Sequence, residues 1–239
     1  MIDVKGLTKA FGDQIVVDRV TFEVGQGETL GLLGENGAGK TTTLRMLATL
    51  LQPTAGSALI GGADLGREPE AVRRQLGIVF EGGVYDRLTA RENIAYFGKL
   101  HGMSGARLAR QVDDVLALLG MEDFAERRAG KLSKGMRQKV VIGRALVHDP
   151  PILLMDEATA GLDVTATRFV LDFVQRAKSE GKTIIFSSHS MAEVERVCDR
   201  VAIIHRGRIV AMGTVAELTA RSNAPSFEEA FVEMVGGNA

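Results

Sequence analysis

The sequence predicts an α/β fold in which a mixed β-sheet carries an N-terminal antiparallel part and is interrupted by an α-helical insert. Two observations predict it. Short apolar stretches typical of strands alternate with amphipathic stretches typical of helices, and one long internal segment contains no convincing strand. The chain has 239 residues, enough to bury a substantial core. Strands are expected at residues 3–7, 17–24, 29–33, 58–60, 77–80, 152–155, 183–187, 201–205 and 209–213.

The helical insert is expected between residues 89 and 147. Within it, four apolar residues recur at the spacing of one helix face: Val112, Val115, Leu116 and Leu119. In the tail, Ser226 and Glu229 have the spacing of a helix cap. We therefore predict one domain, residues 1–239, made of an α/β core (1–88 and 148–215), a helical subdomain (89–147) and a helical tail (216–239).

Residues 34–41, Gly-Glu-Asn-Gly-Ala-Gly-Lys-Thr, fit the pattern G-x-x-x-x-G-K-[ST] of phosphate-binding loops. They follow the expected strand 29–33 and precede a helix-compatible stretch, which is the context that such a loop needs. The glycines let successive backbone N–H groups point at one anion, and the helix adds its positive dipole end. Lys40 would reach the β- and γ-phosphates of a nucleoside triphosphate, and the Thr41 hydroxyl would ligate Mg²⁺. The alternative is a glycine-rich turn that matches by chance. The motif favours the core of a P-loop nucleoside triphosphatase.

Two adjacent acids, Asp156 and Glu157, follow the apolar run 152–155. Such a run is typical of a buried strand, and α/β sheets bind ligands at the carboxyl ends of their strands. Because neighbouring side chains on a strand point to opposite sides, the two acids can have different roles. Asp156 would hold Mg²⁺, and Glu157 would polarise the water that attacks the γ-phosphate. The alternative is a pair of acids that cap the next helix.

Composition excludes several classes of function. Lys+Arg 29 against Asp+Glu 30 gives a net charge of −1, which provides no basic surface for nucleic acid. The single cysteine forms no internal disulfide and suits a reducing cytosol. The longest charge-free stretch, residues 46–63, is interrupted by Gln-Pro-Thr at 52–54 and does not match a membrane span. We therefore expect a soluble protein whose membrane role, if it has one, depends on a partner.

Residues 132–138, Leu-Ser-Lys-Gly-Met-Arg-Gln, resemble the signature motif of ATP-binding-cassette (ABC) ATPases, with Lys134 and Met136 as departures. Ser133 is a good helix N-cap, and Gly135 permits close approach of the backbone to an anion. In that family the motif contacts the γ-phosphate of ATP bound to the other subunit of a head-to-tail dimer. The resemblance therefore implies that Ser133 and Gly135 bind ATP in trans.

The resemblance to ABC ATPases covers nearly the whole chain and implies further roles. Phe11 lies where the family has an aromatic that stacks on adenine; the alternative is a loop aromatic packed on the core. Asp163 ends the run Gly161-Leu162-Asp163, which resembles the family's loop that touches the partner subunit, although Asp163 could equally be a helix cap. His189 matches the switch histidine, which hydrogen-bonds the γ-phosphate, although a histidine after a strand is usually structural. The phosphate-binding loop would hold ATP through Gly34, Asn36, Gly37, Ala38, Gly39, Lys40, Thr41 and Thr42.

Two positions depart from the family pattern. Glu81 replaces a glutamine that touches Mg²⁺ or water at the end of the strand 77–80, whereas Gln75 comes too early and is expected on the preceding helix. A carboxylate at position 81 would offer Mg²⁺ a hard ligand but would add negative charge beside the γ-phosphate. The alternative is that Glu81 points away and contacts only a membrane partner. Ala158 replaces the proline that usually follows the two acids.

The resemblance implies an ATP hydrolase that uses ATP and Mg²⁺, catalyses with Lys40, Glu157 and His189, and serves an ABC transporter. Two copies would close on two Mg-ATP and power integral membrane permease subunits encoded separately, in an exporter most like the sodium-exporter (NatA-like) branch. The chain would lie in the cytoplasm, on the inner face of the cell membrane. The alternatives are a soluble ABC ATPase of the iron–sulfur-assembly type and an ATP clamp of the DNA-repair type. Neutral charge and the short segment between Lys40 and Ser133 argue against the clamp.

Overall fold

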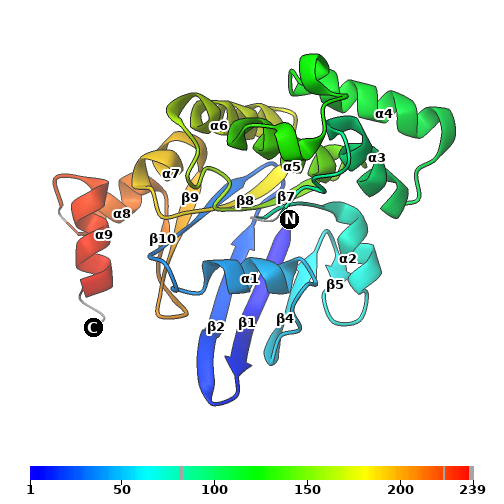
Figure 1. The fold of residues 1–239 in the computed structure, drawn as a ribbon. Helices are drawn as coiled ribbons and strands as arrows, with labels where there is room; N and C mark the ends of the chain where they lie inside the picture. The colour runs from blue at the N-terminus through cyan, green and yellow to red at the C-terminus, as the bar shows by residue number, and fades with distance from the viewer. Residues whose placement is uncertain (81–82, 223, 237–239) are drawn as a thin grey trace.

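A computed structural model describes residues 1–80, 83–222 and 224–236. It confirms the predicted α/β fold, with strands distributed over two sheets (Figure 1). The larger sheet has six strands in the order β10-β9-β3-β8-β7-β6. Their bounds are β3 Thr29–Leu33, β6 Leu76–Val79, β7 Ile152–Asp156, β8 Thr183–Ser188, β9 Arg200–His205 and β10 Arg208–Gly213. All neighbours pair in parallel except β9 and β10, so the sheet is mixed as expected.

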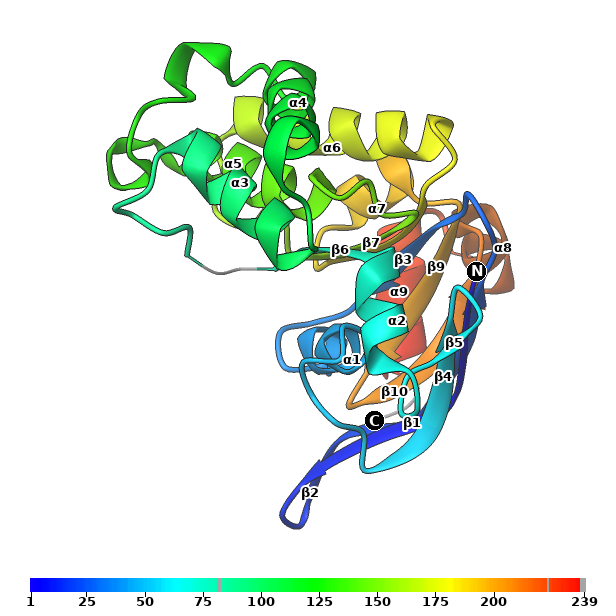
Figure 2. The same ribbon diagram turned by 90° about the vertical axis from the view of Figure 1, so that its right-hand side faces the viewer.

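The N-terminal antiparallel part forms its own sheet, in the order β2-β1-β4-β5. It contains β1 Ile2–Phe11, β2 Gln14–Val24, β4 Ala55–Ile60 and the two-residue β5 Ala63–Asp64, a strand that the sequence pattern did not predict. Helix α1 (Lys40–Leu47) lies between this sheet and the larger one (Figure 2). Its buried Leu44 and Leu47 join one apolar cluster with side chains from both sheets.

Strand β7 is buried on both faces, which explains its continuous apolar run. Ile152 and Leu154 contribute to the cluster around α1, whereas Leu153 and Met155 contribute to a second cluster on the opposite face. Helix α6 (Val164–Ser179) contributes to that second cluster, and α7 (Met191–Val197) lies over the same face (Figure 1). The sheet therefore separates two cores and ends in the loops that carry the candidate site.

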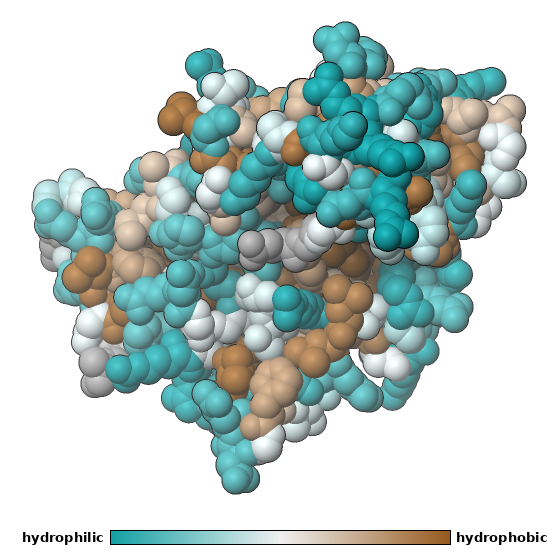
Figure 3. All heavy atoms as spheres, viewed as in Figure 1, coloured by the Kyte–Doolittle hydropathy of each residue, from teal (hydrophilic) through white to brown (hydrophobic). Residues whose placement is uncertain are grey.

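Between β6 and β7, the described residues of the predicted insert form helices and no strand. These are α3 Ala90–Leu100, α4 Gly105–Leu118 and α5 Lys134–Leu146, with two short 3₁₀ turns at Glu122–Phe124 and Ala129–Lys131. The face Val112, Val115, Leu116 and Leu119 is buried as predicted. The three α-helices lie together beside the larger sheet, and hydrophilic residues gather over them on the outer surface (Figure 3). Helix α2 (Pro69–Gln75) precedes β6, as expected for Gln75.

The C-terminal tail is helical in its described part. Helix α8 (Val215–Arg221) begins with a capping box between Thr214 and Glu217. Helix α9 (Phe227–Gly236) follows Ser226, whose hydroxyl accepts a hydrogen bond from the Glu229 N–H at 3.2 Å, as predicted. Among the described residues, no helix is long and apolar enough to cross a membrane.

Candidate functional site

Residues 34–39 connect β3 to α1 in a tight turn. Two positions of this turn, 34 and 39, accept only glycine. A side chain at Gly34 would place its Cβ 2.3 Å from the carbonyl oxygen of Ile204. Gly39 has a φ of 107°, in the left-handed region, and its Cβ would lie 2.9 Å from the Val16 carbonyl oxygen. The predicted strand, loop and helix are therefore present, with glycines where the backbone requires them.

Lys40 begins α1, and its side chain folds back over this loop. Its Nζ donates to the carbonyl oxygens of Gly34 at 2.7 Å and Glu35 at 3.1 Å. The same Nζ forms an ion pair with Oε1 of Glu157 at 3.1 Å. The two groups are not aligned for a hydrogen bond, and Oε1 has no hydrogen-bond partner among the described residues. Only 4% of Lys40 is exposed. A buried cation is thus held at the centre of the loop and faces the second predicted motif.

Asp156 and Glu157 lie at the carboxyl end of β7, where a serine of the neighbouring strand holds both. The hydroxyl of Ser187 donates to Oδ1 of Asp156 at 2.6 Å and accepts from the Glu157 N–H at 3.0 Å. Glu157 has a φ of 47°, an unfavourable conformation for a residue with a side chain. The turn after β7 is therefore fixed by contacts with β8 and not by local preference.

His189 follows β8 directly, and its Nδ1 lies 2.7 Å from Oε2 of Glu157. The histidine side chain is 56% exposed, whereas that of Glu157 is 17% exposed. One carboxylate thus contacts Lys40 with one oxygen and His189 with the other. The structure brings together three residues that are predicted to be catalytic and that come from three different strand ends.

A pocket of about 290 Å³ lies beside this triple and exposes the loop to solvent. Residues from the loop, from α1 and from β2 line it together with Glu157: Val16, Asn36, Gly37, Gly39, Lys40, Thr41 and Thr42. At the end of β1, Phe11 is 51% exposed, and the ammonium of Lys9 lies 5.0 Å from its ring centroid. An exposed ring does not pack on the core, contrary to the alternative considered for Phe11.

Ser133 and Asp163 both cap helices, as their sequence contexts predict. The Ser133 hydroxyl accepts from the Met136 N–H at 3.3 Å, and Asp163 Oδ1 accepts from the Ala166 N–H at 2.8 Å. Neither Ser133 nor Gly135 is among the described residues that line the pocket beside Lys40. Within one chain, Ser133 and Gly135 therefore do not contribute to the described pocket at the phosphate-binding loop.

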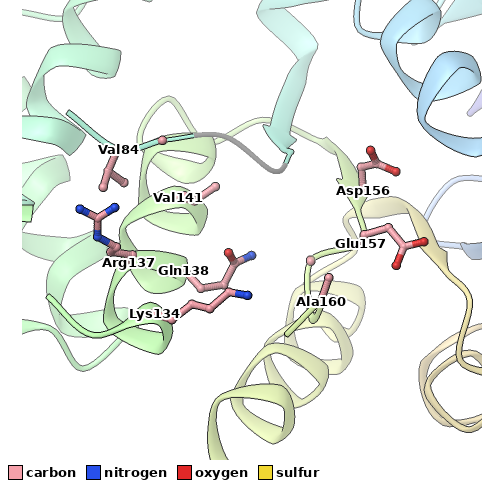
Figure 4. Close-up of a pocket in the computed structure, with 10 residues that line it drawn as sticks. Val84, Lys134, Arg137, Gln138, Val141, Asp156, Glu157 and Ala160 are labelled. Atoms are coloured by element: carbon pink, nitrogen blue, oxygen red, sulfur yellow. The ribbon is translucent and has the colours of Figure 1, made fainter. Parts of the chain in front are cut away.

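A second pocket of about 290 Å³ separates α5 from the turn after β7. Figure 4 shows Lys134 and Gln138 on one side and Ala160 on the other, with the carboxylates of Asp156 and Glu157 directed away from α5. Arg137 is paired with Asp86. Among the described residues, no ion pair joins a cation of α5 to Asp156 or Glu157.

Glu81 lies outside the described residues, and Gln75 ends α2 with its amide donating to the Ile60 carbonyl oxygen at 3.3 Å. Ser187 and Val16 were not predicted, although Ser187 precedes the motif histidine by only two residues. The contribution of Ser187 depends on strand register, which pairs Asp156 with Ser187 across two parallel strands.

Comparison with known proteins identifies the family. The model of the family described as ABC transporter matches residues 17–160. The chain is 46% identical over 218 residues to the ABC transporter ATP-binding protein NatA of Bacillus subtilis (strain 168), covering 90% of this chain and 86% of that protein. It is 39% identical to the Nod factor export ATP-binding protein I of Rhizobium sp. (strain N33), over 89% of this chain and 70% of the relative.

Solved structures agree with this assignment. The structure of an ATP-binding subunit of an ABC transporter superimposes with a TM-score of 0.88 at 34% identity, covering 98% of this chain and 99% of that chain. The dimeric post-hydrolysis state of an ATP-binding cassette bound to ADP and Pi has a TM-score of 0.81 at 26% identity, over 90% and 98% of the two chains. By sequence and by fold, the chain belongs to the ABC transporter family.

Proposed function

We propose that this chain is the ATP-hydrolysing subunit of an ABC transporter. The observation that carries the proposal is the Glu157 carboxylate, which contacts both the loop lysine and His189. A half-buried acid between a phosphate-binding cation and a histidine fits a group that accepts a proton from water beside a γ-phosphate. The family and its relatives, named as ATP-binding proteins, support the same function.

Binding of ATP is assigned to backbone amides and to a small number of side chains. The N–H groups of residues 34–39 and the start of α1 offer a positive site for phosphate. When ATP enters, Lys40 exchanges Glu157 for phosphate oxygens, because its carbonyl partners carry no charge that could compete. Phe11 stacks on adenine with the ring face that Lys9 does not cover. His189 donates to the γ-phosphate and keeps Glu157 in place.

The oxygen ligands expected for Mg²⁺ are the Thr41 hydroxyl and the Asp156 carboxylate. Mg²⁺ prefers hard oxygen ligands and retains several waters, so two protein ligands beside ATP suffice. The residues fit, because Ser187 occupies only Oδ1 of Asp156 and leaves Oδ2 without a hydrogen-bond partner among the described residues. Bound there, Mg²⁺ would neutralise charge on the β- and γ-phosphates.

A complete site requires a second copy of the chain. Ser133 is exposed at the start of α5 and is absent from the pocket beside Lys40, so we assign Ser133 and Gly135 to ATP bound by the partner. Asp163, at the start of α6, is assigned to the loop between the two subunits. A dimeric solved relative bound to ADP and Pi supports this arrangement. The result is a head-to-tail homodimer around two ATP molecules.

The membrane partner is proposed to be a permease of an exporter, since one relative is named as a Nod factor export protein. Three exposed side chains on or beside the helical subdomain (residues 89–147) are assigned to this contact: Tyr85, Tyr96 and Leu100. Tyr85 and Tyr96 contact edge to face with centroids 5.2 Å apart, and Leu100 is 63% exposed. With such a partner, the chain would lie on the cytoplasmic face of the cell membrane. The relatives' names give no support to the iron–sulfur-assembly or DNA-repair alternatives.

Affinity purification of the tagged chain from its native membranes tests the transporter assignment. We expect a polytopic membrane protein to co-purify in stoichiometric amount, and Tyr96→Glu to release it. Ser57→Glu, at an exposed position on β4 in the N-terminal antiparallel sheet, serves as a control for added negative charge. Recovery of the chain without any membrane protein, together with full ATPase activity, would favour the soluble alternative.

A further inference from the structure

Glu193 lies outside every motif singled out above, yet it connects the two turns that carry Glu157 and His189. It belongs to the first turn of α7, where its Oε2 accepts two hydrogen bonds. The Thr159 hydroxyl donates at 2.8 Å and the Ser188 hydroxyl at 2.7 Å. Both donor residues are buried, with 7% and 1% of their surfaces exposed. A single carboxylate oxygen therefore joins two buried hydroxyls from different segments.

The two hydroxyls flank the residues proposed to be catalytic. Thr159 follows Glu157 by two residues, in a turn closed by a hydrogen bond from the Ala160 N–H to the Glu157 carbonyl oxygen at 2.9 Å. Ser188 immediately precedes His189, and its oxygen also accepts the Ser190 N–H at 2.9 Å. Glu193 thus restrains the backbone after Glu157 and the backbone on both sides of His189. The contact between Glu157 and His189, at 2.7 Å, is exposed on the histidine side and needs such support.

An acid in the first turn of a helix is favourable in any protein, because it faces the positive end of the dipole. The helix dipole does not explain why Glu193 accepts hydrogen bonds from two buried hydroxyls. Its α7 has no side-chain cap hydrogen bond, and both of its own hydrogen bonds are to hydroxyls of other segments. A charged acceptor makes stronger hydrogen bonds than a neutral one, so two short bonds to one oxygen hold both turns firmly.

We propose that Glu193 is a positioning residue for ATP hydrolysis, which sets the spacing between Glu157 and His189. This rests on the function proposed above for those two residues. Glu193 touches neither ATP nor water in this scheme, and it acts only through Thr159 and Ser188. Because Glu193 makes no contact with Lys40 or the loop amides, which carry most of the proposed ATP binding, loss of Glu193 should lower turnover far more than the affinity for ATP.

The test compares Glu193→Ala and Glu193→Gln with Glu195→Ala, an exposed acid on the same helix. For each variant, kcat for phosphate release, the Kd for ATP and the melting temperature are measured. Small displacements of catalytic groups cost up to about 10²-fold in rate, so we expect Glu193→Ala to lower kcat by about 10- to 100-fold with a much smaller change in Kd. Glu193→Gln keeps an acceptor oxygen and should recover part of the loss, whereas Glu195→Ala should match the wild type.

The hydroxyl partners provide a second readout. Thr159→Val combined with Ser188→Ala should lower kcat, and Glu193→Ala added to that pair should cost little more, because the same interaction is already lost. Should Glu193→Ala fail to fold, Glu193→Gln and the hydroxyl variants decide the question. Wild-type kcat in Glu193→Ala, or equal losses of kcat, ATP binding and thermal stability, would overturn the proposal. A wild-type chain that neither binds nor hydrolyses ATP would instead overturn the underlying function.

Discussion

Glu157→Gln separates ATP binding from ATP hydrolysis, because it keeps the size of the side chain and removes its charge. Without a general base, kcat is expected to fall by about 10²–10⁴, equivalent to about 3–5 kcal/mol of activation free energy. The glutamine oxygen can still accept a hydrogen bond from His189, so the position of the histidine should be retained. ATP-bound dimers should then accumulate, since hydrolysis no longer separates the subunits.

The same change also removes the anionic partner of Lys40. The Lys40 Nζ and Glu157 Oε1 are 3.1 Å apart, with 5% and 17% of the two side chains exposed. At an effective dielectric constant of 20, unit charges at that distance attract by about 5 kcal/mol. Two carbonyl hydrogen bonds to Lys40 remain, so we expect the nucleotide-free variant to lose about 3 kcal/mol of unfolding free energy, the low end for breaking a buried pair. ATP replaces the lost anion and should raise the melting temperature of the variant more than that of the wild type.

Phosphate release, ATP titration calorimetry, thermal melting with and without Mg-ATP, and light scattering measure these effects. Glu195→Gln, exposed on α7, is the matched control and should behave as the wild type. Hydrolysis at the wild-type rate by Glu157→Gln would remove Glu157 from catalysis. Loss of ATP binding in that variant would refute the view that the carboxylate competes with phosphate for Lys40.

Three further predictions concern other parts of the molecule. Subunits carrying Ser133→Arg and subunits carrying Lys40→Ala should each be inactive, but their mixture should regain ATPase activity because one composite site is intact; inactive heterodimers would contradict a head-to-tail dimer. Gly34→Ala should lower the unfolding free energy by about 1–3 kcal/mol and abolish ATP binding, since its Cβ would lie 2.3 Å from a carbonyl oxygen, and a wild-type urea midpoint would contradict this. Burial lowers the pKa of His148 from 6.5 to about 4, so the unfolded chain takes up the proton first and stability should fall as the pH decreases from about 6.5 to about 4. Urea midpoints at pH 7.5 and pH 5 should therefore differ less in His148→Gln than in the wild type, and equal differences would refute the assignment.

Local motifs allowed much of the fold and of the candidate site to be predicted. The strand, glycine-rich turn and helix around Lys40 follow one another directly in the chain, so their sequence predicts their structure. The same holds for the acids at the end of β7 and for the helix cap at Ser133. The two-residue strand β5 is too short for a recognisable alternation of side chains, and the pattern missed it.

The contacts within the site were less predictable, because they join distant parts of the chain. Glu157 meets Lys40 and His189 only because β3, β8 and β7 are neighbours in the larger sheet. The register that pairs Asp156 with Ser187 depends on the packing of the whole sheet and on no local motif. Glu193 has no motif of its own, and its significance rests on two hydroxyls that only the folded chain brings together.

Phosphate release from Mg-ATP by the purified chain is the decisive assay for the proposed ATPase function. We expect steady hydrolysis by the wild type and none by Lys40→Ala, because the buried ammonium is the only side-chain cation that lines the described pocket at the glycine-rich loop. Hydrolysis that persists at the wild-type rate in Lys40→Ala, or a folded wild-type chain that releases no phosphate at any protein concentration, would contradict it.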